Sequence, residues 1–211
     1  QHYFVANELV RHGVRFASLA PRFCGEFQKG IDYIGDVEQF SCELAVHDAI
    51  AKKFGYKVSV HSGSDKFMVF PAVGRLTGGI FHLKTAGTNW LEAVRLVAIK
   101  DPAFYRELHA FALNSFAEAT TYYHVTTDLG RIPDINTLSD EQLPDLMNHN
   151  DARQLLHITY GLILTAKDEA GNRYLRDRLY ALLDTYTDDY ASLLEGHIGR
   201  HLALLLGDTQ A

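Results

Sequence analysis

The stretch VSVHSGSDKF, residues 58–67, decides the expected fold of this chain. Two valines alternate with Ser59 and His61, and a period of two is typical of a β-strand with two different faces. Small and polar residues follow, among them Gly63, and they indicate that the strand ends at His61 and that the chain turns there. The stretch therefore predicts a strand that carries an imidazole at its carboxyl end.

Similar runs elsewhere in the chain predict further strands, with helical patterns between them. We expect strands over residues 14–20, 57–61, 80–84 and 122–126. Asp36, with Gln39 three residues later, resembles a capping box that begins a helix, and Gly55 ends that helix. Asp101 followed by proline begins another helix. Alternating strands and helices are typical of a parallel α/β sheet.

The order of these elements divides the chain into two parts of one expected domain. Residues 1–132 would hold four βα units, and residues 133–211 form an all-helical tail, with a capping box at Ser139. Eight strands close a (β/α)₈ barrel, so four units form either a small open sheet or half a barrel. The chain opens with Gln1 inside an apparent helical pattern, which favours a fragment: the carboxyl-terminal half of a TIM-like barrel.

Composition excludes several classes of protein. The chain has 211 residues, of which 47% are hydrophobic and 22% are charged, as is ordinary for a soluble globular protein. A net charge of −6 argues against a nucleic-acid partner. No apolar run approaches the roughly 20 residues of a membrane span. Two cysteines without a metal spacing or disulfide framework indicate a cytoplasmic setting.

Each expected strand carries a reactive side chain at its carboxyl end, the edge where active sites of parallel α/β folds lie. His61 and His124 each precede an acid by four residues, Asp65 and Asp128. Imidazole and carboxylate ligands suit zinc, manganese, cobalt or nickel, whereas the alternative is a hydrogen-bonded core histidine. His82 lies two residues deeper in its strand, where an interior or ligand-supporting role is favoured. The histidines on helices, including His197 and His201, give no signal of their own.

Other polar residues at these strand ends suit the binding of an anion or the transfer of a proton. Arg22 and Lys84 could hold a carboxylate or phosphate, and Thr85 precedes a helix start that attracts anions unless Thr88 simply caps it. Glu26 lies in a long polar loop and is a candidate acid–base group or metal ligand; the alternative is an ion pair with a neighbouring cation. Ser64 is expected to cap the next helix, with Asp65 and Lys66 in its first turn.

Five blocks of the sequence resemble one enzyme family. They are SLAPRFCGEFQKGIDYIGD (18–36), YKVSVHSGSDKF (56–67), FHLKTAGTNWLEAVR (81–95), YYHVTTDL (122–129) and DARQLLHITYG (151–161). Together they resemble, in order and over nearly the whole chain, the carboxyl-terminal half of the tagaturonate epimerase family. The positions that match the family's motifs are Arg22, Glu26, His61, Asp65, Lys66, Lys84 and His124. The resemblance implies a metal-dependent barrel enzyme that interconverts tagaturonate and fructuronate, with part of its site outside these residues.

The chemistry that the resemblance implies assigns expected roles. The epimerised carbon is beta to the ketone, so simple enolisation cannot invert it; retro-aldol cleavage and re-addition can, and transient oxidation is the alternative, although no Gly-rich dinucleotide motif is present. We expect a divalent metal ion (zinc, manganese, cobalt or nickel) as cofactor. The expected roles are catalysis by Glu26, Asp65 and Lys66, substrate binding by Arg22, Lys84, Thr85 and Asp128, and metal binding by His61 and His124.

Two other functions remain open at this point. The chain could be a non-catalytic half-barrel that needs its amino-terminal half or a second copy of itself, because open strand edges invite pairing. It could also belong to an aldolase that cleaves ketose sugar acids and releases the fragments.

Overall fold

The structure, a computed structural model, describes residues 1–207, and these residues form two compact units. Unit 1 contains residues 1–28, 32–86 and the chain from residue 198 onward, and unit 2 contains residues 29–31 and 87–197. The expected division at residue 132 thus falls inside unit 2, and the single-domain organisation stays a prediction. The last residues of the expected helical tail, 208–211, lie outside the described residues.

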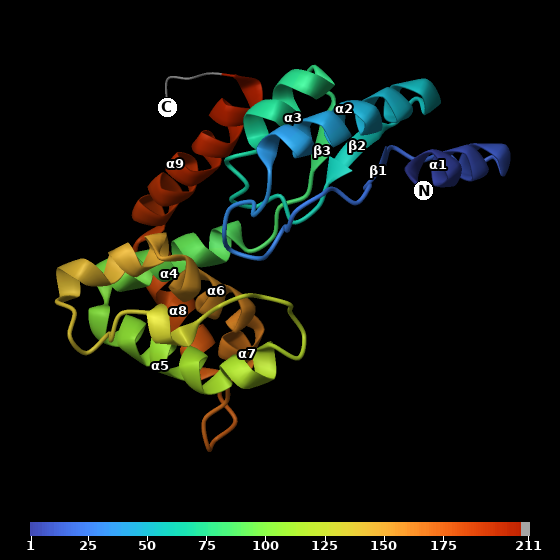
Figure 1. Ribbon diagram of the computed structural model, residues 1–211. Helices are drawn as coiled ribbons and strands as arrows, with labels where there is room; N and C mark the ends of the chain where they lie inside the picture. Colours follow the sequence, from blue (N-terminus) through green and yellow to red (C-terminus); the bar gives the residue numbers. More distant parts are fainter. Residues whose placement is uncertain (208–211) are drawn as a thin grey trace. The chain divides into compact units, whose positions relative to one another are not determined.

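Unit 1 is built on a three-stranded parallel sheet in the order β1-β2-β3 (Figure 1). The strands are β1 (Ser18–Leu19), β2 (Lys57–Val60) and β3 (Phe81–Leu83), each shorter than expected from the sequence. Parallel pairing is confirmed, with Leu19 opposite Val58. The fourth expected strand is wrong: residues 122–126, all of them described, form turn and irregular structure in unit 2.

The helices of unit 1 begin and end where local chemistry predicts. They are α1 (His2–Arg11), α2 (Val37–Phe54), α3 (Phe70–Thr77) and the last turns of α9 (Thr187–Leu206). The Asp36 carboxylate accepts hydrogen bonds from the backbone N–H groups of Glu38 and Gln39, at 2.8 and 3.1 Å. Gly55 ends α2 with φ at +78°, a conformation that glycine adopts without strain. Only half of the expected capping box forms, because the Gln39 side chain donates to Glu43 instead.

The core of unit 1 lies on one face of its sheet. Val58 and Val60 are each 1% exposed and share an apolar cluster with Phe40 of α2 and Phe70 of α3. Burying a large apolar side chain of this kind contributes about 1.5–3 kcal/mol. This face therefore holds the helices, and the opposite face of the sheet is left to the polar residues of the strands.

Unit 2 is helical (Figure 1). Its elements are α4 (Thr88–Lys100), α5 (Pro102–Ala119), η1 (Leu129–Arg131), η2 (Asp140–Asn148), α6 (Asn150–Ile158), α7 (Tyr160–Thr165), α8 (Tyr174–Thr185) and the first turns of α9. The N-caps at Asp101 and Ser139 are confirmed, although Ser139 begins a 3₁₀-helix and not an α-helix. The all-helical tail expected from residue 133 onward is thus divided into short helices, and α6 and α7 are separated at Thr159. None of the helices among the described residues is long and apolar enough to cross a membrane.

Candidate functional site

The polar face of the sheet in unit 1 is the first component of the site. Pairing places Ser59 opposite His82 and Ser18 opposite Lys57, and residues paired across parallel strands point to the same face. The valines of β2 face the helices, so these polar residues face the other way. His82 and Lys84 are exposed there, as the alternation in the sequence predicts.

A hydrogen-bonded row crosses this polar face. The Nδ1 atom of His82 lies 2.9 Å from Ser59 Oγ and 3.2 Å from Ser18 Oγ, so hydroxyls from two neighbouring strands hold one imidazole. Ser59 is only 1% exposed. The ring of His61 lies 6.4 Å from that of His82, with an angle of 86° between the planes. Two histidines thus lie near each other, His61 directly after β2 and His82 in the middle of β3.

The loop after β2 is strained and is not the start of a helix. The expected helix that Ser64 would cap is wrong, because α3 begins only at Phe70. Ser62 and Asp65 adopt φ angles of +53° and +60°, in the left-handed region that costs a residue with a side chain about 1–2 kcal/mol. The Ser64 hydroxyl donates to the carbonyl of Ala86 and accepts from its N–H, so its capping capacity is used elsewhere. Strain of this kind clusters at functional sites.

Contacts from the neighbouring strand hold this loop in place. The Gly63 N–H donates to the carbonyl of Lys84 at 2.9 Å. A Cβ atom at Gly63 would lie 2.4 Å from Leu83 Cδ1, so the close approach requires glycine. The Lys66 ammonium, fully buried, donates to the carbonyls of Gln28 and Ser64 at 2.8 and 3.0 Å. Lys66 therefore braces two loops, and its expected catalytic role stays a prediction.

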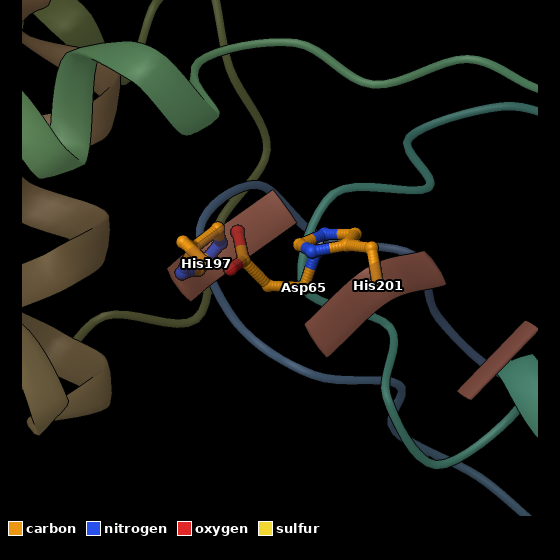
Figure 2. A group of neighbouring side chains, drawn as sticks. All are labelled: Asp65, His197 and His201. Carbon is orange, nitrogen blue, oxygen red and sulfur yellow. The ribbon is translucent and has the colours of Figure 1, made fainter. Parts of the chain in front are cut away.

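Helix α9 also supports this loop. The Asp65 N–H donates to Nε2 of His201 at 3.1 Å, and the His201 ring packs against the rings of Phe67 and Phe70 at 4.9 and 5.2 Å. Figure 2 shows the His201 ring beside the backbone nitrogen of Asp65, with the Asp65 carboxylate pointing away from that ring. Helix α9 packs so closely against α3 that a Cβ atom at Gly74 would lie 1.7 Å from the Leu205 carbonyl oxygen. Only glycine fits at this position.

Asp65, His197 and His201 form a group that sequence reasoning missed. Each offers one potential ligand atom, and these atoms all lie within 4.8 Å of one another. His197 precedes His201 by one turn of α9, so the continuous helix sets their separation. Two imidazoles and a carboxylate suit a divalent transition metal. The missed signal was the spacing of four residues between the two histidines, which places both on one helix face.

The hydrogen bonds of the two α9 histidines indicate which nitrogen atoms could ligate a metal. His197 Nδ1 lies 3.2 Å from Glu92 Oε1 within unit 2, which makes Nε2 its potential ligand atom. A carboxylate on the distal nitrogen is the usual support for a ligating histidine. His201 Nε2 accepts the Asp65 N–H, so Nδ1 would be its ligand atom. These three residues thus offer donor atoms that suit a divalent metal ion, and the structure does not identify which metal.

The loop between β1 and α2 carries two more predicted site residues. Glu26 and Ile34 pair through their backbones, at 2.8 and 3.2 Å, and the Glu26 carboxylate accepts a hydrogen bond from the Gln28 side chain. Arg22 lines an open cavity of about 470 Å³ together with residues of α1 and α2. His2 lines it as well, and burial, with His47 beside it, lowers the pKa of His2 to about 4. Glu26 and Arg22 are both exposed, as expected for groups that meet a substrate.

The remaining predicted residues lie in two places. Thr85 is exposed in unit 1, and α4 begins at Thr88 with Gly87 as its N-cap, so the capping role considered for Thr88 is wrong. His124 and Asp128 are exposed in unit 2. Asp128 Oδ1 accepts the Gly130 N–H at 2.9 Å and begins η1. Seven predicted residues thus belong to unit 1, and the roles of all nine stay predictions.

A parallel sheet with an apolar, helix-covered face and a polar, histidine-bearing face defines an α/β protein of the class whose sites lie at strand ends. Comparison with known proteins narrows this class. The family model described as "UxaE: tagaturonate epimerase" matches residues 1–205. The chain belongs to the tagaturonate epimerase family, which confirms the resemblance seen in its sequence.

Individual relatives agree with this assignment. The chain is 45% identical over 207 residues to a tagaturonate/fructuronate epimerase of Thermotoga maritima. It is 60% identical to fructuronate-tagaturonate epimerase UxaE from Cohnella laeviribosi, with a TM-score of 0.95 to both the native and a glycerol-complexed crystal structure. The match covers 97% of this chain and 42% of the Cohnella chain. The Thermotoga match likewise covers 98% of this chain and 42% of that protein, so the chain spans less than half the length of these relatives.

Proposed function

We propose that the protein containing this chain is a metal-dependent epimerase that interconverts tagaturonate and fructuronate. The observation that carries this proposal is the histidine-bearing polar face of the sheet, beside a strained and braced loop, in a chain 60% identical to a fructuronate-tagaturonate epimerase. If His61 were only a surface residue and the loop after β2 only a turn, the left-handed conformations of Ser62 and Asp65 would have no function.

The one-sided packing of the sheet supports a barrel for the complete protein. Among the described residues of unit 1, α2 and α3 share the core with the apolar face, and the polar face carries Lys57, His82 and Lys84. In a (β/α)₈ barrel that second face lines the interior and the active site. We infer that further strands, from an amino-terminal half or a second copy of the chain, complete it. Activity then belongs to the assembled barrel.

The chain's own residues suit epimerisation by carbon–carbon bond cleavage. Arg22 and Lys84 hold the carboxylate of the sugar acid by charge-assisted hydrogen bonds. Glu26 takes the proton from the hydroxyl on the carbon beta to the ketone, and the electron pair of the alpha–beta bond moves into the ketone fragment. The aldehyde fragment rotates, the bond forms again on its other face, and Glu26 returns the proton. Thr85 and Asp128 are proposed to contact substrate hydroxyls.

Two donor sets of this chain fit a divalent metal ion. One begins with His61 on the polar face of the sheet, and the other is the group of Asp65, His197 and His201. A bound zinc, manganese, cobalt or nickel ion would act as a Lewis acid on the ketone and hydroxyl oxygens of the substrate. His124 remains a predicted ligand.

The test is turnover by the purified full-length protein. Tagaturonate is incubated with protein that has been stripped of metal and resupplied with manganese, cobalt, nickel or zinc, and nuclear magnetic resonance follows the appearance of fructuronate. The proposal predicts interconversion that depends on one of these metals. Absence of fructuronate with all four metals would exclude it, and accumulation of free three-carbon products would indicate an aldolase. The 211-residue chain alone is expected to be inactive.

A further inference from the structure

We propose that His47 of α2 is a positioning residue, which together with Glu43 holds the backbone of the loop after β1 and thereby sets the place of Arg22. His2 of α1 and Tyr56 in turn hold the His47 ring. The inference deepens the proposed function and rests on it, because Arg22 is the side chain proposed to bind the carboxylate of the sugar acid. All five residues belong to unit 1.

Two side chains of α2 reach the backbone of this loop. The Cys24 N–H donates to the Glu43 carboxylate at 2.8 Å, and this bond is the main cause that lowers the pKa of Glu43. The His47 ring hydrogen-bonds the Arg22 backbone and packs edge-on against the Phe23 ring, with 5.3 Å between the ring centroids. A spacing of four residues places both side chains on one face of the helix. The loop is therefore attached to α2 at two points, while the Arg22 side chain stays exposed.

The hydrogen bonds of His47 assign the position of a proton on each ring. A backbone group that raises the pKa of an imidazole, as Arg22 does here, accepts a hydrogen bond from it. His47 Nδ1 lies 2.9 Å from His2 Nδ1, so Nε2 of His47 carries the hydrogen for Arg22, and Nδ1 accepts from His2. His2 Nε2 then accepts from the Tyr56 hydroxyl at 2.6 Å. One chain of donors thus runs from Tyr56 through both histidines to the loop.

Burial keeps this chain of hydrogen bonds in its neutral form. It lowers the pKa of both histidines, to about 4 for His2, so neither ring is charged at neutral pH. Tyr56 is 7% exposed, and burial raises the pKa of its hydroxyl, which therefore keeps the proton that it donates. All four ring nitrogens of His2 and His47 have partners, so this pair offers no lone pair to a metal ion.

The alternative role for these bonds is to join α1 to α2 and nothing more. The chain of donors does not end on a second helix, however, but on the backbone of the residue that carries the positive charge. The bond between an arginine and a carboxylate is directional, and a small displacement of the guanidinium weakens it. Loss of His47 should therefore weaken substrate binding, and a purely structural contact would not have this selective effect.

The first experiment measures the steady-state kinetics of the full-length, metal-loaded protein with tagaturonate. His47→Leu keeps an apolar contact with Phe23 but cannot donate to the loop, and we expect KM to rise about 10-fold while kcat changes less than about 3-fold. His47→Gln, whose amide can both donate and accept, should return KM close to the native value. The matched control is His12→Leu in the same unit, whose side chain is 67% exposed and which should keep the native KM.

The results that contradict the inference are equally specific. A native KM in His47→Leu would overturn it, and a fall in kcat with unchanged KM would assign His47 to structure alone. The thermal unfolding midpoint is measured for each variant. If His47→Leu does not fold, His2→Phe takes its place, because it keeps an aromatic ring and removes the donor to His47. The expected rise in KM is then about 3-fold, and a native KM would overturn the inference.

The second experiment does not depend on turnover. Hydrogen exchange followed by mass spectrometry reports the Cys24 amide, which should exchange about 10-fold faster in Glu43→Ala, because the acceptor is lost. Glu43→Gln keeps an acceptor oxygen and should stay near the native rate. The decisive variant is His47→Leu, in which Glu43 is intact and exchange at Cys24 should still be faster. Native exchange in that variant would show that His47 does not hold the loop.

The outcome is separable from that of the proposed function. If the protein does not convert tagaturonate, the epimerase proposal fails, and exchange at Cys24 in His47→Leu and His47→Gln still decides whether His47 holds the loop. If the protein converts tagaturonate and His47→Leu keeps the native KM, the epimerase proposal stands and the inference fails.

Discussion

Two segments with similar sequence patterns have different structures. Residues 57–61 and 122–126 both combine β-branched or aromatic residues with a histidine, and both precede an acid. The first forms β2, which pairs with β1 on one edge and β3 on the other. The second follows α5 and forms no strand. The comparison shows that a strand pattern describes a surface suited to pairing, and that neighbouring strands decide whether a strand forms.

The two segments are also held by different interactions. The loop after β2 contains a buried lysine, a glycine fitted against Leu83, and an N–H bound by a helix distant in sequence. Directly after the second segment, the Thr127 hydroxyl donates to the Gln154 side chain at 2.9 Å and the Asp128 N–H donates to the Asp151 carboxylate at 2.8 Å, both within unit 2. We therefore expect substitutions in the first loop to cost much more stability than those in the second.

The largest effect is expected from Lys66→Ala. Removing this fully buried side chain leaves a cavity and takes a charged donor from the carbonyls of Gln28 and Ser64, at a cost of about 4 kcal/mol. Urea unfolding followed by circular dichroism measures the change. The control is Arg131→Ala in η1, shortly after the second segment; its side chain is 74% exposed in its ion pair with Asp128, and the substitution should change stability by less than about 0.5 kcal/mol. If the two substitutions lowered the free energy of unfolding equally, the loop after β2 would not be the more strongly stabilised of the two regions.

Acid should loosen the helix that leads into the second segment. Burial lowers the pKa of His109 on α5 to about 4, from 6.5. The unfolded chain therefore binds a proton that the folded unit excludes, so stability falls as the pH drops from 6.5 to about 4, by on the order of 3 kcal/mol. Trp90 is the single tryptophan of the chain and lies on α4, so its fluorescence follows unit 2.

Removing the titrating group tests this assignment. His109→Leu keeps an apolar side chain on the buried face of α5, and its stability should lose most of the slope between pH 6.5 and 4. A variant that is as sensitive to acid as the native chain would show that another group governs the transition. The mutation also removes two ring nitrogens that are buried without hydrogen-bond partners among the described residues, so stability at neutral pH should not fall.

The helix boundaries that the sequence predicted correctly depend on local residues. The caps at Asp36, Gly55, Asp101 and Ser139 depend on residues within one turn of the chain, and each is present. The strand over 122–126 and the helix start at Ser64 failed because partners distant in sequence decide them. Ser64 binds Ala86, and a strand at 122–126 would need a neighbour to pair with. Local chemistry thus fixes where helices begin, and long-range pairing fixes which polar runs become strands.

In the candidate site, too, local features could be predicted from the sequence and contacts between distant residues could not. Alternation along the strands correctly placed the polar residues of β2 and β3 on one face. The sequence pattern did not show that Lys66 is buried. A lysine in a polar stretch is expected to be exposed to solvent, and the carbonyl groups that bind Lys66 are known only from the structure. The bond between Asp65 and His201 joins residues separated by 136 positions, which no local pattern reveals. Of the group of Asp65, His197 and His201, only the four-residue spacing of the two histidines could be recognised in the sequence.

A smaller effect is expected at that distant bond. His201→Leu keeps apolar packing against Phe67 and Phe70 and leaves the Asp65 N–H without its acceptor, in a residue that is already strained. We expect a loss of about 2 kcal/mol and faster hydrogen exchange of the Asp65 amide. His201→Gln, whose carbonyl can accept the same bond, should recover part of the protection. Unchanged exchange in His201→Leu would show that the loop holds itself, and His124→Leu serves as the control in the second segment.

The smallest effect is expected at Asp128. Its carboxylate accepts the Gly130 N–H at 2.9 Å and caps one short 3₁₀-turn at the surface, so Asp128→Ala should cost about 0.5–1 kcal/mol. Asp128→Ser keeps an acceptor at the cap and should restore this loss in urea unfolding followed by Trp90 fluorescence. A role in substrate binding makes a different prediction, because serine would restore stability while the KM for tagaturonate stays raised. If both variants match the native KM, Asp128 acts only as the cap of η1 and does not bind the substrate.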